Sequence, residues 1–367
     1  MLQQIINGVI LTPSGWLREG SIVTEDNKII DVLRNTSLIE GADVIDAKGQ
    51  YVVPGAIDIH IHGGGGADFQ DTTEEAFRTA IETHRRHGTT AFMPTLSSSS
   101  KARIEAAAET CQRLMQEPNS PILGLHLEGP YFNPKKAGGQ EPGVIRLPDR
   151  DEYIELIERF PCIKRWDAAP ELDGAMEFGR YASEHGVLVG LAHTTADAET
   201  VRRAYDNGYT HATHFYNAMT SIHKEGMYKH DGTVEGVYLV PDMTVEMIAD
   251  GIHSPPTVLQ LIYNMKGVER TALITDALAC TDSADGRAFD PRVVIEDGVC
   301  VLKDHTALAG SIATTDRMIR TIVGRTNIPL EDAIRMASET PARILGVFDR
   351  KGSIEKGKDA DLWFFTL

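Results

Sequence analysis

Residues 54–66 read PGAIDIHIHGGGG and place two histidines one residue apart at the end of an apolar run. Residues i and i+2 of a β-strand point to the same face, so His60 and His62 present their imidazoles side by side. The apolar residues at 52–57 predict a buried strand, and the glycines at 63–66 end it and let another group approach closely. Two interpretations follow: a pair of metal ligands at the carboxyl end of a strand, or two histidines that form hydrogen bonds there.

The length and composition predict a globular α/β protein. A chain of 367 residues suits one large domain with an appendage, and 42% hydrophobic with 24% charged residues allow a sizeable core. The formal net charge of −17 argues against nucleic acid and anionic membranes as partners, because no basic surplus is present to neutralise phosphates. A local phosphate pocket remains compatible with this charge.

The cysteines and the amino terminus bear on the cellular compartment. Cys111, Cys162, Cys280 and Cys300 are scattered without CxxC spacing, which predicts reduced core residues rather than a disulfide framework. The first ten residues, MLQQIINGVI, lack the basic region of a signal peptide, and no apolar run reaches the roughly 18 residues that span a bilayer. We therefore predict a cytoplasmic protein.

Both ends of the chain predict short β-strands. Residues 1–50 alternate apolar and polar positions between turn signals, and residues 352–363, GSIEKGKDADLW, have the same texture. We predict a small β-rich domain formed by residues 1–50 together with 345–367, and a central domain of residues 51–344.

In the central domain, strands alternate with helices. After the His60 strand, further strands are expected at residues 87–94, 121–129, 163–170, 186–193, 209–217, 243–253 and 271–276. Amphipathic stretches predict helices between them, including 72–86, 99–116, 174–185 and 196–207. Eight strand–helix units match a (β/α)8 TIM barrel, whose active site lies at the carboxyl ends of the strands. A doubly wound open sheet is the alternative, but it would not normally need so many strands in series.

Polar residues recur at the ends of these strands: His60, His62, Glu128, His193, His214, His253 and Asp276. A single histidine or aspartate at such a place is more often a hydrogen-bonded group than a ligand. In a barrel, however, these ends converge on one mouth. Four imidazoles with a carboxylate fit one or two divalent metals with an open position for water, so the full set favours a metal site.

Asp276 is expected to handle protons rather than to bind the metal tightly. A metal lowers the pKa of bound water from 15.7 towards about 7, and a nearby carboxylate can accept the released proton and deliver it to a leaving amine. The predicted chemistry is hydrolysis of an amide or a related carbonyl bond.

Motifs in the same order along the chain carry a family resemblance: HLEGPYF (126–132), LAHTTA (191–196), HFYNAM (214–219), ADGIH (249–253), ITDA (274–277) and LAGS (308–311). With the His60–Ile61–His62 pair, they resemble the amidohydrolase superfamily and, within it, the family of N-acetylglucosamine-6-phosphate deacetylases. The resemblance implies a distorted TIM barrel with a β-sandwich made from both chain ends. It also implies an enzyme that hydrolyses a linear amide bond, removing acetate from N-acetylglucosamine 6-phosphate to give glucosamine 6-phosphate.

The resemblance assigns roles to the polar residues. Glu128, His193 and His214 match the principal metal ligands, and Asp276 matches the general base and acid. Because this chain keeps His60 and His62, a second metal with Glu128 bridging is compatible with the pattern. Zinc is the first expectation, with iron, cobalt or manganese as alternatives.

The resemblance also implies residues that contact an amino-sugar substrate. Segments that match its sugar contacts contain Asn217, Ala218, Leu308, Ala309 and Gly310. His253 matches a contact near the phosphate end. Gly139 and Gln140 fall in a lid, where Gln140 can donate a hydrogen bond to the acetyl carbonyl but cannot carry a charge.

One departure bears on the phosphate. The family places an arginine eleven residues after the sixth-strand histidine, where it reaches the phosphate of a neighbouring subunit, and this chain has Glu225 there. A carboxylate would repel phosphate, so His223 or Lys224, or alternatively Lys229 or His230, is expected to replace the arginine. The alternative is that these are solvated loop charges.

Other functions stay open beside the phosphorylated substrate. They are a deacetylase of a different or unphosphorylated amino sugar, a cyclic-amide hydrolase, and a non-catalytic scaffold with this fold. The glutamate ligand disfavours the cyclic-amide hydrolase, for which the family resemblance implies a carbamylated lysine. A scaffold is expected to have lost ligands or the aspartate, and this chain keeps them. A homodimer is implied only by the resemblance.

Overall fold

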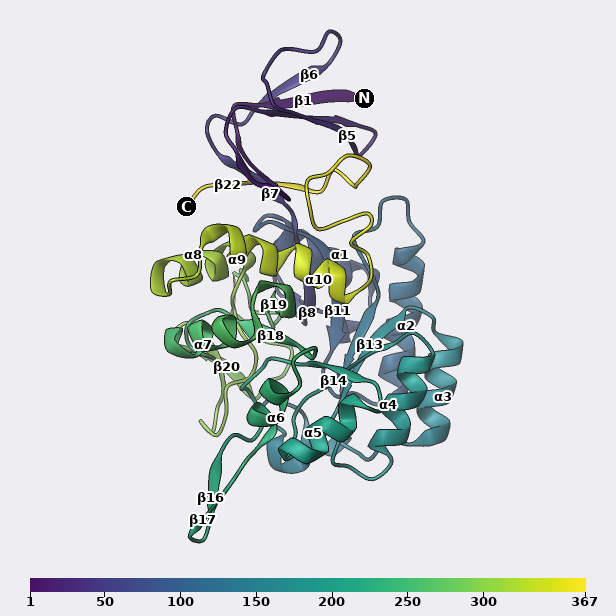
Figure 1. Ribbon diagram of the computed structural model, residues 1–367. Coiled ribbons are helices and arrows are strands. Elements are labelled where there is room, and N and C mark those ends of the chain that lie inside the picture. The colour runs from purple at the N-terminus through teal and green to yellow at the C-terminus, as the bar shows by residue number, and fades with distance from the viewer. Residues whose placement is uncertain (285) are drawn as a thin grey trace.

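The computed structural model describes residues 1–284 and 286–367, and at its centre lies a sheet of eight parallel strands (Figure 1). In chain order they are β8 (Ala56–Ile61), β11 (Thr89–Leu96), β12 (Leu125–Glu128), β13 (Ile163–Ala168), β14 (Leu188–Leu191), β15 (Tyr209–Ala212), β18 (Thr244–Ile248) and β19 (Thr271–Ile274). Each strand pairs with the next one along the chain. A doubly wound sheet reverses its strand order at a switch point, so this order confirms the predicted barrel and excludes the open sheet.

The first and last strands, β8 and β19, face each other and close the barrel. The backbone N–H of Asp276 donates to the carbonyl oxygen of His60 at 2.9 Å. Beside this bond, the hydroxyl of Thr275 donates to Oδ2 of the buried Asp58 at 2.5 Å. This seam places Asp276 next to the two histidines of the first strand.

A helix follows each barrel strand and covers its outer side (Figure 1). These helices are α1 (Glu74–Arg85), α2 (Lys101–Met115), α3 (Arg150–Arg159), α4 (Ala175–Glu184), α5 (Ala198–Tyr205), α6 (Thr233–Leu239), α7 (Pro256–Lys266) and α8 (Thr315–Arg325), and α9 (Leu330–Ala337) and α10 (Glu339–Ile344) come after them. The four predicted helices are confirmed as α1, α2, α4 and α5, and each begins one or two residues later and ends one or two residues earlier than predicted. Thr73 and Ser100 have extended backbones and accept the N–H of Ala76 and Arg103, so they cap α1 and α2 rather than belong to them.

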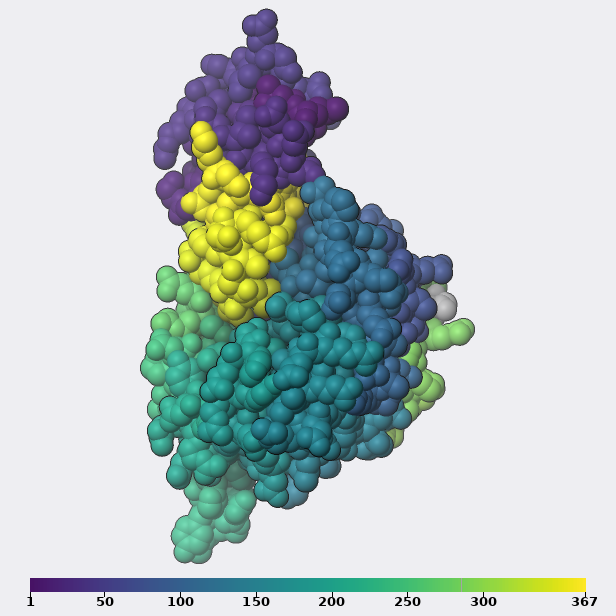
Figure 2. All heavy atoms as spheres, turned by 90° about the vertical axis from the view of Figure 1, so that its right-hand side faces the viewer, coloured from purple at the N-terminus to yellow at the C-terminus, as the bar shows by residue number. Residues whose placement is uncertain are grey.

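Two four-stranded sheets built from the chain ends lie against the barrel. One contains, in spatial order, β5 (Lys28–Leu33), β4 (Ser21–Glu25), β1 (Leu2–Ile6) and β6 (Asp43–Asp46). The other contains β22 (Leu362–Phe365), β7 (Tyr51–Pro54), β2 (Val9–Thr12) and β3 (Gly15–Leu17). In Figure 2 the amino-terminal residues form a purple lobe, and the yellow carboxyl-terminal residues lie between this lobe and the rest of the molecule.

Strand β7 differs from the expectation for residues 52–57. Val52 and Val53 were expected to begin the His60 strand, but they belong to the terminal sheet, where β7 pairs with β2 and β22. Gly55 separates β7 from β8 and lies so close to Thr90 that a Cβ atom would be 2.2 Å from its hydroxyl oxygen. The exact domain boundaries at residues 50 and 345 stay a prediction.

The remaining strands form three hairpins, and short 3-10 helices lie in the loops. The hairpins are β9 (Gly63–Gly64) with β10 (Ala67–Asp68), β16 (His223–Glu225) with β17 (Tyr228–His230), and β20 (Val293–Glu296) with β21 (Val299–Leu302). The 3-10 helices are η1 (Phe69–Asp71), η2 (Pro134–Lys136), η3 (Pro142–Val144) and η4 (Val268–Arg270). All four cysteines are buried and free, as predicted. Within the described ranges, no helix has both the length and the apolar character needed to cross a bilayer.

Candidate metal centre and active site

Three of the predicted site residues lie just beyond the ends of their strands. His193, His214 and Asp276 each come two residues after the last residue of β14, β15 and β19. Their φ angles are 45°, 30° and 50°, a left-handed backbone that residues other than glycine seldom adopt. Such strain is concentrated at functional sites, and here it turns each side chain at the rim of the barrel.

The first group of candidate ligands is Glu128, His193 and His214, all buried. Oε1 of Glu128 lies 3.2 Å from Nε2 of His193 and 3.0 Å from Nε2 of His214. The two Nε2 atoms are only 3.1 Å apart. Two ring nitrogens at that distance, both facing one carboxylate oxygen, repel each other unless a proton or a cation lies between them. The group therefore has the donor set and the spacing that a divalent cation requires.

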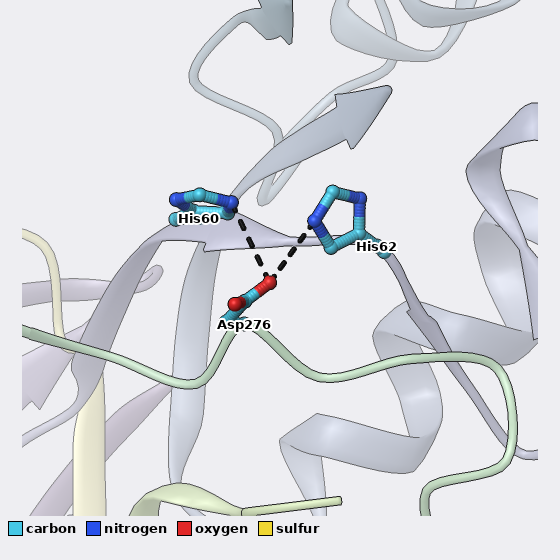
Figure 3. A group of neighbouring side chains, drawn as sticks. All are labelled: His60, His62 and Asp276. Atoms are coloured by element: carbon cyan, nitrogen blue, oxygen red, sulfur yellow. Dashed lines mark ion pairs between the residues drawn. The ribbon is translucent and has the colours of Figure 1, made fainter. Parts of the chain in front are cut away.

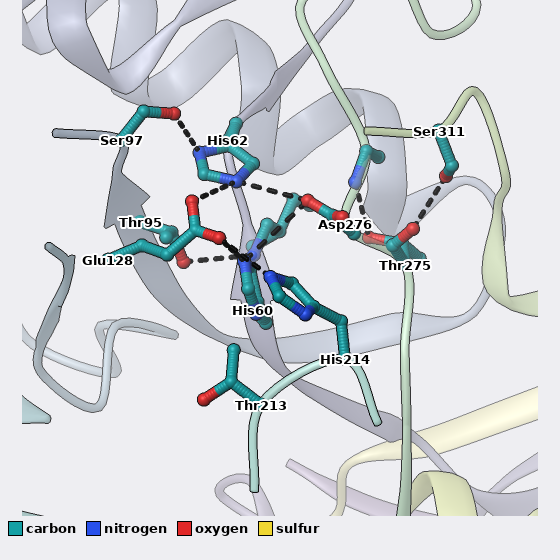
Figure 4. A network of polar contacts seen from close by, with 12 residues as sticks. His60, His62, Thr95, Ser97, Glu128, Thr213, His214, Thr275, Asp276 and Ser311 are labelled. Atoms are coloured by element: carbon teal, nitrogen blue, oxygen red, sulfur yellow. Dashed lines mark hydrogen bonds and ion pairs between the residues drawn. The ribbon is translucent and has the colours of Figure 1, made fainter. Parts of the chain in front are cut away.

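The second group is His60, His62 and Asp276 (Figure 3). Oδ1 of Asp276 lies 3.1 Å from Nε2 of His62 and 3.6 Å from Nε2 of His60. Glu128 joins this group to the first one, because its Oε2 lies 3.4 Å from Nε2 of His62 and its Oε1 lies 3.7 Å from Nε2 of His60 (Figure 4). One carboxylate thus stands between two histidine pairs.

Hydrogen bonds fix which ring nitrogen of the histidines faces the centre. Nδ1 of His193 lies 2.7 Å from the carbonyl oxygen of Lys136, and Nδ1 of His60 lies 3.0 Å from Oε2 of Glu246. Both oxygens can only accept, so these Nδ1 atoms carry the protons and the Nε2 atoms remain available as ligands. Nε2 of His60 is buried and has no hydrogen-bond partner among the described residues, as expected for an atom that faces a metal position.

Burial and the carboxylates act in opposite directions on the pKa values of the site. Burial alone would lower the pKa of His62, but Asp276 and Glu128 outweigh it and raise this pKa to about 9. Burial opposes Glu128 at His214 in the same way, and that pKa is also raised to about 9. Asp276 is buried, yet the imidazoles of His60 and His62 lower its pKa. The carboxylates are therefore anionic and attract positive charge, which fits a divalent cation.

A third group, His60, His126 and Asp167, also has ligand atoms close together. Its cation is already present in the chain, because the guanidinium of Arg165 donates to both oxygens of Asp167, at 3.1 and 3.0 Å. All of these side chains are fully buried. A divalent ion here would be repelled by the guanidinium, so we assign this group to the support of the site rather than to a metal.

A cavity of about 970 Å³ opens onto the metal groups. Its wall contains His62, Glu128, His193, His214 and Asp276. The eight residues predicted to contact substrate also lie in this wall: Gly139, Gln140, Asn217, Ala218, His253, Leu308, Ala309 and Gly310. Their roles stay predictions, but the structure brings them together at one opening.

Gln140 is held at both ends of its amide. Its Oε1 accepts the backbone N–H of Ser98 at 2.7 Å, and its Nε2 donates to Oε2 of Glu128 at 2.7 Å. A hydrogen bond from Gln140 to an acetyl carbonyl would therefore have to compete with its bond to Glu128. His253 is held similarly, with Nδ1 2.7 Å from Oδ2 of Asp250.

The residues predicted to contact phosphate, His223 and Lys224, lie apart from this cavity. They belong to the hairpin β16–β17, which projects from the body of the molecule (Figure 1) and whose residues are exposed. Neither is part of the cavity wall. Phosphate contacts by these residues would require a second copy of the chain, so this role stays a prediction.

The sequence of this chain matches a known family along most of its length. The profile of the amidohydrolase family matches residues 51–367. The chain belongs to the amidohydrolase family. It is 33% identical over 365 residues to the N-acetylglucosamine-6-phosphate deacetylase of Bacillus subtilis, covering 96% of this chain and 90% of the relative.

Two further comparisons agree with this assignment. The N-acetylgalactosamine-6-phosphate deacetylase of Escherichia coli O157:H7 is 33% identical over 362 residues, covering 96% of this chain and 92% of the relative. The crystal structure of N-acetylglucosamine-6-phosphate deacetylase from Pasteurella multocida superposes with a TM-score of 0.93 at 28% identity, covering 100% of this chain and 96% of that chain. The fold of this amidohydrolase, terminal sheets included, is thus that of a solved relative.

Two kinds of site residue were not predicted from the sequence. One is the buried charged set of Arg165, Asp167 and Glu246 beneath the ligands. A charge inside the apolar strand segment TVEMI is the signal that could have pointed to Glu246. The other is a set of cationic side chains in the cavity wall: Arg103, Lys135, Lys136 and Arg292. Surface-like lysines and arginines carry no comparable signal.

Proposed function

We propose that this amidohydrolase removes acetate from N-acetylglucosamine 6-phosphate and releases glucosamine 6-phosphate. One observation carries the proposal: Glu128 stands between two histidine pairs at a cavity of about 970 Å³, with Asp276 3.1 Å from His62. Its full-length relatives in Bacillus subtilis and Pasteurella multocida are named for this reaction, which supports the choice of substrate.

The residues present fit one or two divalent ions. Glu128, His193 and His214 would hold one, and His60 and His62 with Glu128 a second. The amidohydrolase superfamily is metal-dependent, and we propose zinc for this imidazole and carboxylate set, with iron, cobalt or manganese as alternatives. When bound, the ion supplies a nucleophile from water near neutral pH and polarises the amide carbonyl.

Asp276 is the group that moves the proton. Its carboxylate lines the cavity and is anionic, because the adjacent imidazoles lower its pKa. It accepts a proton as the oxygen of water attacks the acetyl carbonyl, and it returns the proton to the amine nitrogen as the C–N bond breaks. The second proton of water stays on the carboxyl group of the product and then passes to the amine, so the products are acetate and the protonated amine.

The cationic side chains of the cavity favour an anionic substrate. Arg103, Lys135, Lys136 and Arg292 line it in a chain whose formal net charge is −17. Arg292 is also paired with Asp290 at 2.6 Å, which leaves the other three as the less committed charges. The wall also contains the carboxylates of Asp68, Glu128, Glu141, Asp276 and Asp290, so a sugar phosphate would be attracted by these cationic side chains and not by the wall as a whole.

Because Glu225 stands where the family has an arginine, any positive charge that the hairpin offers to the phosphate bound by a second copy of the chain has to come from its other residues. We propose that the exposed His223 and Lys224 reach the cavity of a partner in a homodimer and add to its positive charge. The alternative of solvated loop charges predicts that their removal leaves catalysis unchanged. The cytoplasmic location stays a prediction.

The proposed function is tested by acetate release from the zinc-loaded protein at equal substrate concentrations well below saturation. The substrates are N-acetylglucosamine 6-phosphate, its galacto epimer and unphosphorylated N-acetylglucosamine. The epimer is included because a relative named for it is also 33% identical. A preference of 100-fold for the 6-phosphate, about 2.7 kcal/mol of transition-state binding, is expected.

The other outcomes separate the alternatives. Comparable rates with and without phosphate would favour a deacetylase of unphosphorylated amino sugars. Faster acetate release from the galacto epimer would identify that epimer as the preferred substrate, and the proposed reaction would still be deacetylation. No release from any of the three would overturn the proposal and favour a non-catalytic scaffold or another amide substrate.

A further inference from the structure

Glu246 is a fully buried carboxylate in the apolar strand β18. A buried charge is costly unless it is paired and hydrogen-bonded, so its partners indicate what it does. The position lies beneath the metal groups, and no part of the mechanism proposed above uses it.

One oxygen of Glu246 contacts a residue of each metal group. Oε2 lies 3.0 Å from Nδ1 of His60 and accepts the backbone N–H of His214 at 2.9 Å. A carboxylate oxygen accepts only, so it selects the His60 tautomer with the proton on Nδ1. That tautomer directs the lone pair of Nε2 towards Glu128 and Asp276, which lie 3.7 and 3.6 Å away.

The other oxygen of Glu246 is anchored from the opposite side. Oε1 accepts from Nη1 of Arg165 and lies 3.3 Å from Nε2 of His211. Arg165 is itself fixed by both oxygens of Asp167 and by the carbonyl of Ile59 at 3.1 Å. Because Glu246, Arg165 and Asp167 are fully buried and paired with one another through Arg165, Glu246 cannot turn away from His60 without leaving Arg165 partly unpaired.

We propose that Glu246 is a positioning residue that fixes His60 as a metal ligand and couples the His60 group to the His214 group. The inference rests on the metal-dependent function proposed above, and it concerns metal binding rather than turnover. Supporting partners of metal-binding histidines commonly change metal affinity by about 10- to 100-fold when they are removed.

The Glu246→Gln variant tests this tautomer directly. The guanidinium of Arg165 attracts the amide oxygen, so the amide NH₂ is left facing Nδ1 of His60 and the backbone N–H of His214, which loses its acceptor. Nδ1 must then accept, and the proton moves to Nε2, where it blocks metal binding. The main-chain oxygen of residue 246 still accepts the N–H of Phe215, which keeps the turn at His214 in place.

The experiment is competition of the metal-free protein with a chromophoric chelator for Zn²⁺, without substrate. His60→Gln identifies the dissociation constant that belongs to the His60 group. For E246Q we expect that constant to rise by about 10- to 100-fold, with a smaller change for the group of Glu128, His193 and His214. The matched control is Asp167→Asn, which removes the other buried carboxylate that pairs with Arg165; Asp167 bonds to His126, Arg165 and Thr213 and not to a residue of the two metal groups.

Each outcome decides the proposal. Weak zinc binding in E246Q with near-normal binding in D167N supports it, provided that both metal-free proteins melt at similar temperatures. Should E246Q fail to fold, Glu246→Asp keeps the charge beside Arg165 but withdraws the carboxylate from His60, and the same weakening is expected. Unchanged zinc constants, equal weakening in D167N, or a wild-type constant that H60Q does not alter would overturn it. A failure to release acetate would leave these zinc constants unaffected.

Discussion

The barrel mouth and the hairpin β16–β17 are both rich in histidine and charge, yet they differ in what holds the side chains. At the mouth, Glu128 lies 3.0 and 3.2 Å from two imidazoles, and all of these groups are buried. In the hairpin, Glu225 lies 3.6 and 4.0 Å from two imidazoles, and its side chain is 69% exposed.

This difference shows why similar residues carry different weight. Glu128, His193 and His214 at the mouth come from the ends of three different strands, so the closed barrel fixes their distances, and the low dielectric strengthens their interactions. The hairpin residues come from two strands of one projecting loop, where water screens the charges and the side chains keep their freedom. Substitutions at the mouth should therefore cost far more than substitutions in the hairpin.

The largest effect is expected for Glu128→Gln. The substitution keeps the volume but removes the negative charge that four histidines share, so both metal groups lose their common ligand. We expect loss of bound zinc after dialysis and a fall in turnover of more than about 1000-fold, or roughly 4 kcal/mol. Glu117→Gln, which alters an exposed ion pair with Arg78, is the control. Zinc content and turnover near wild type in E128Q would contradict the assignment of the barrel mouth as the metal centre and active site.

The next effect is expected for Asp276→Asn. The amide cannot accept a proton, while the ligand sets around Glu128 stay intact. We expect zinc content to be kept and turnover to fall at least about 100-fold. The exposed Asp282→Asn in the following loop should change neither. If D276N loses zinc in parallel with activity, Asp276 acts as a ligand rather than as the base.

The same contrast explains what could be predicted from the sequence. The barrel was predicted from the strand–helix rhythm, and the gathering of His60, His62, Glu128, His193 and His214 was predicted because strand ends of a parallel barrel must converge; their roles as metal ligands stay a prediction. The strand predicted at 209–217 was wrong beyond Ala212, where the chain turns at His214. That turn depends on the N–H of Phe215 donating to the main-chain oxygen of residue 246, a pairing 31 residues away that local pattern does not reveal.

The support beneath the ligands was missed for a related reason. Arg165 and Glu246 are 81 residues apart; Glu246 is a single charge in the strand TVEMI, whereas Arg165 stands among other charged residues in the strand IKRWDA. Only the closed barrel brings them together under His60. The role of the hairpin residues could not be predicted for a different reason. Their charges are evident from the sequence, but nothing in the local sequence says which cavity they approach.

A smaller effect is expected for the double variant His223→Ala, Lys224→Ala. If a partner copy uses these charges, KM for the 6-phosphate should rise by up to about 10-fold, about 1.4 kcal/mol, while KM for the unphosphorylated sugar stays constant. The measurement is a pair of initial-rate curves with the two substrates. His305→Ala, at an exposed histidine of another loop, is the control. Equal KM values for variant and wild type would assign the hairpin charges to solvent.

The smallest effect is expected at His87, whose half-buried position lies between the two extremes. Nδ1 of His87 lies 3.2 Å from Asp316 and Nε2 lies 3.4 Å from Asp282. The bond to Asp316 raises the pKa of His87 above 6.5, although burial opposes it. Between pH 6.5, the pKa of histidine in the unfolded chain, and the raised pKa of His87 in the folded protein, the folded protein binds more protons than the unfolded chain. The stabilisation from the charged His87 is therefore complete below pH 6.5 and is lost as the pH rises through the pKa of the folded protein. We expect His87→Gln to lower the free energy of unfolding in urea at pH 6 by less than about 1 kcal/mol and to lower it less at pH 9. An equal loss of the free energy of unfolding at both values of pH would mean that His87 stabilises the protein by packing. Half-burial would then be too little to strengthen the interactions of its charge as burial does at the mouth.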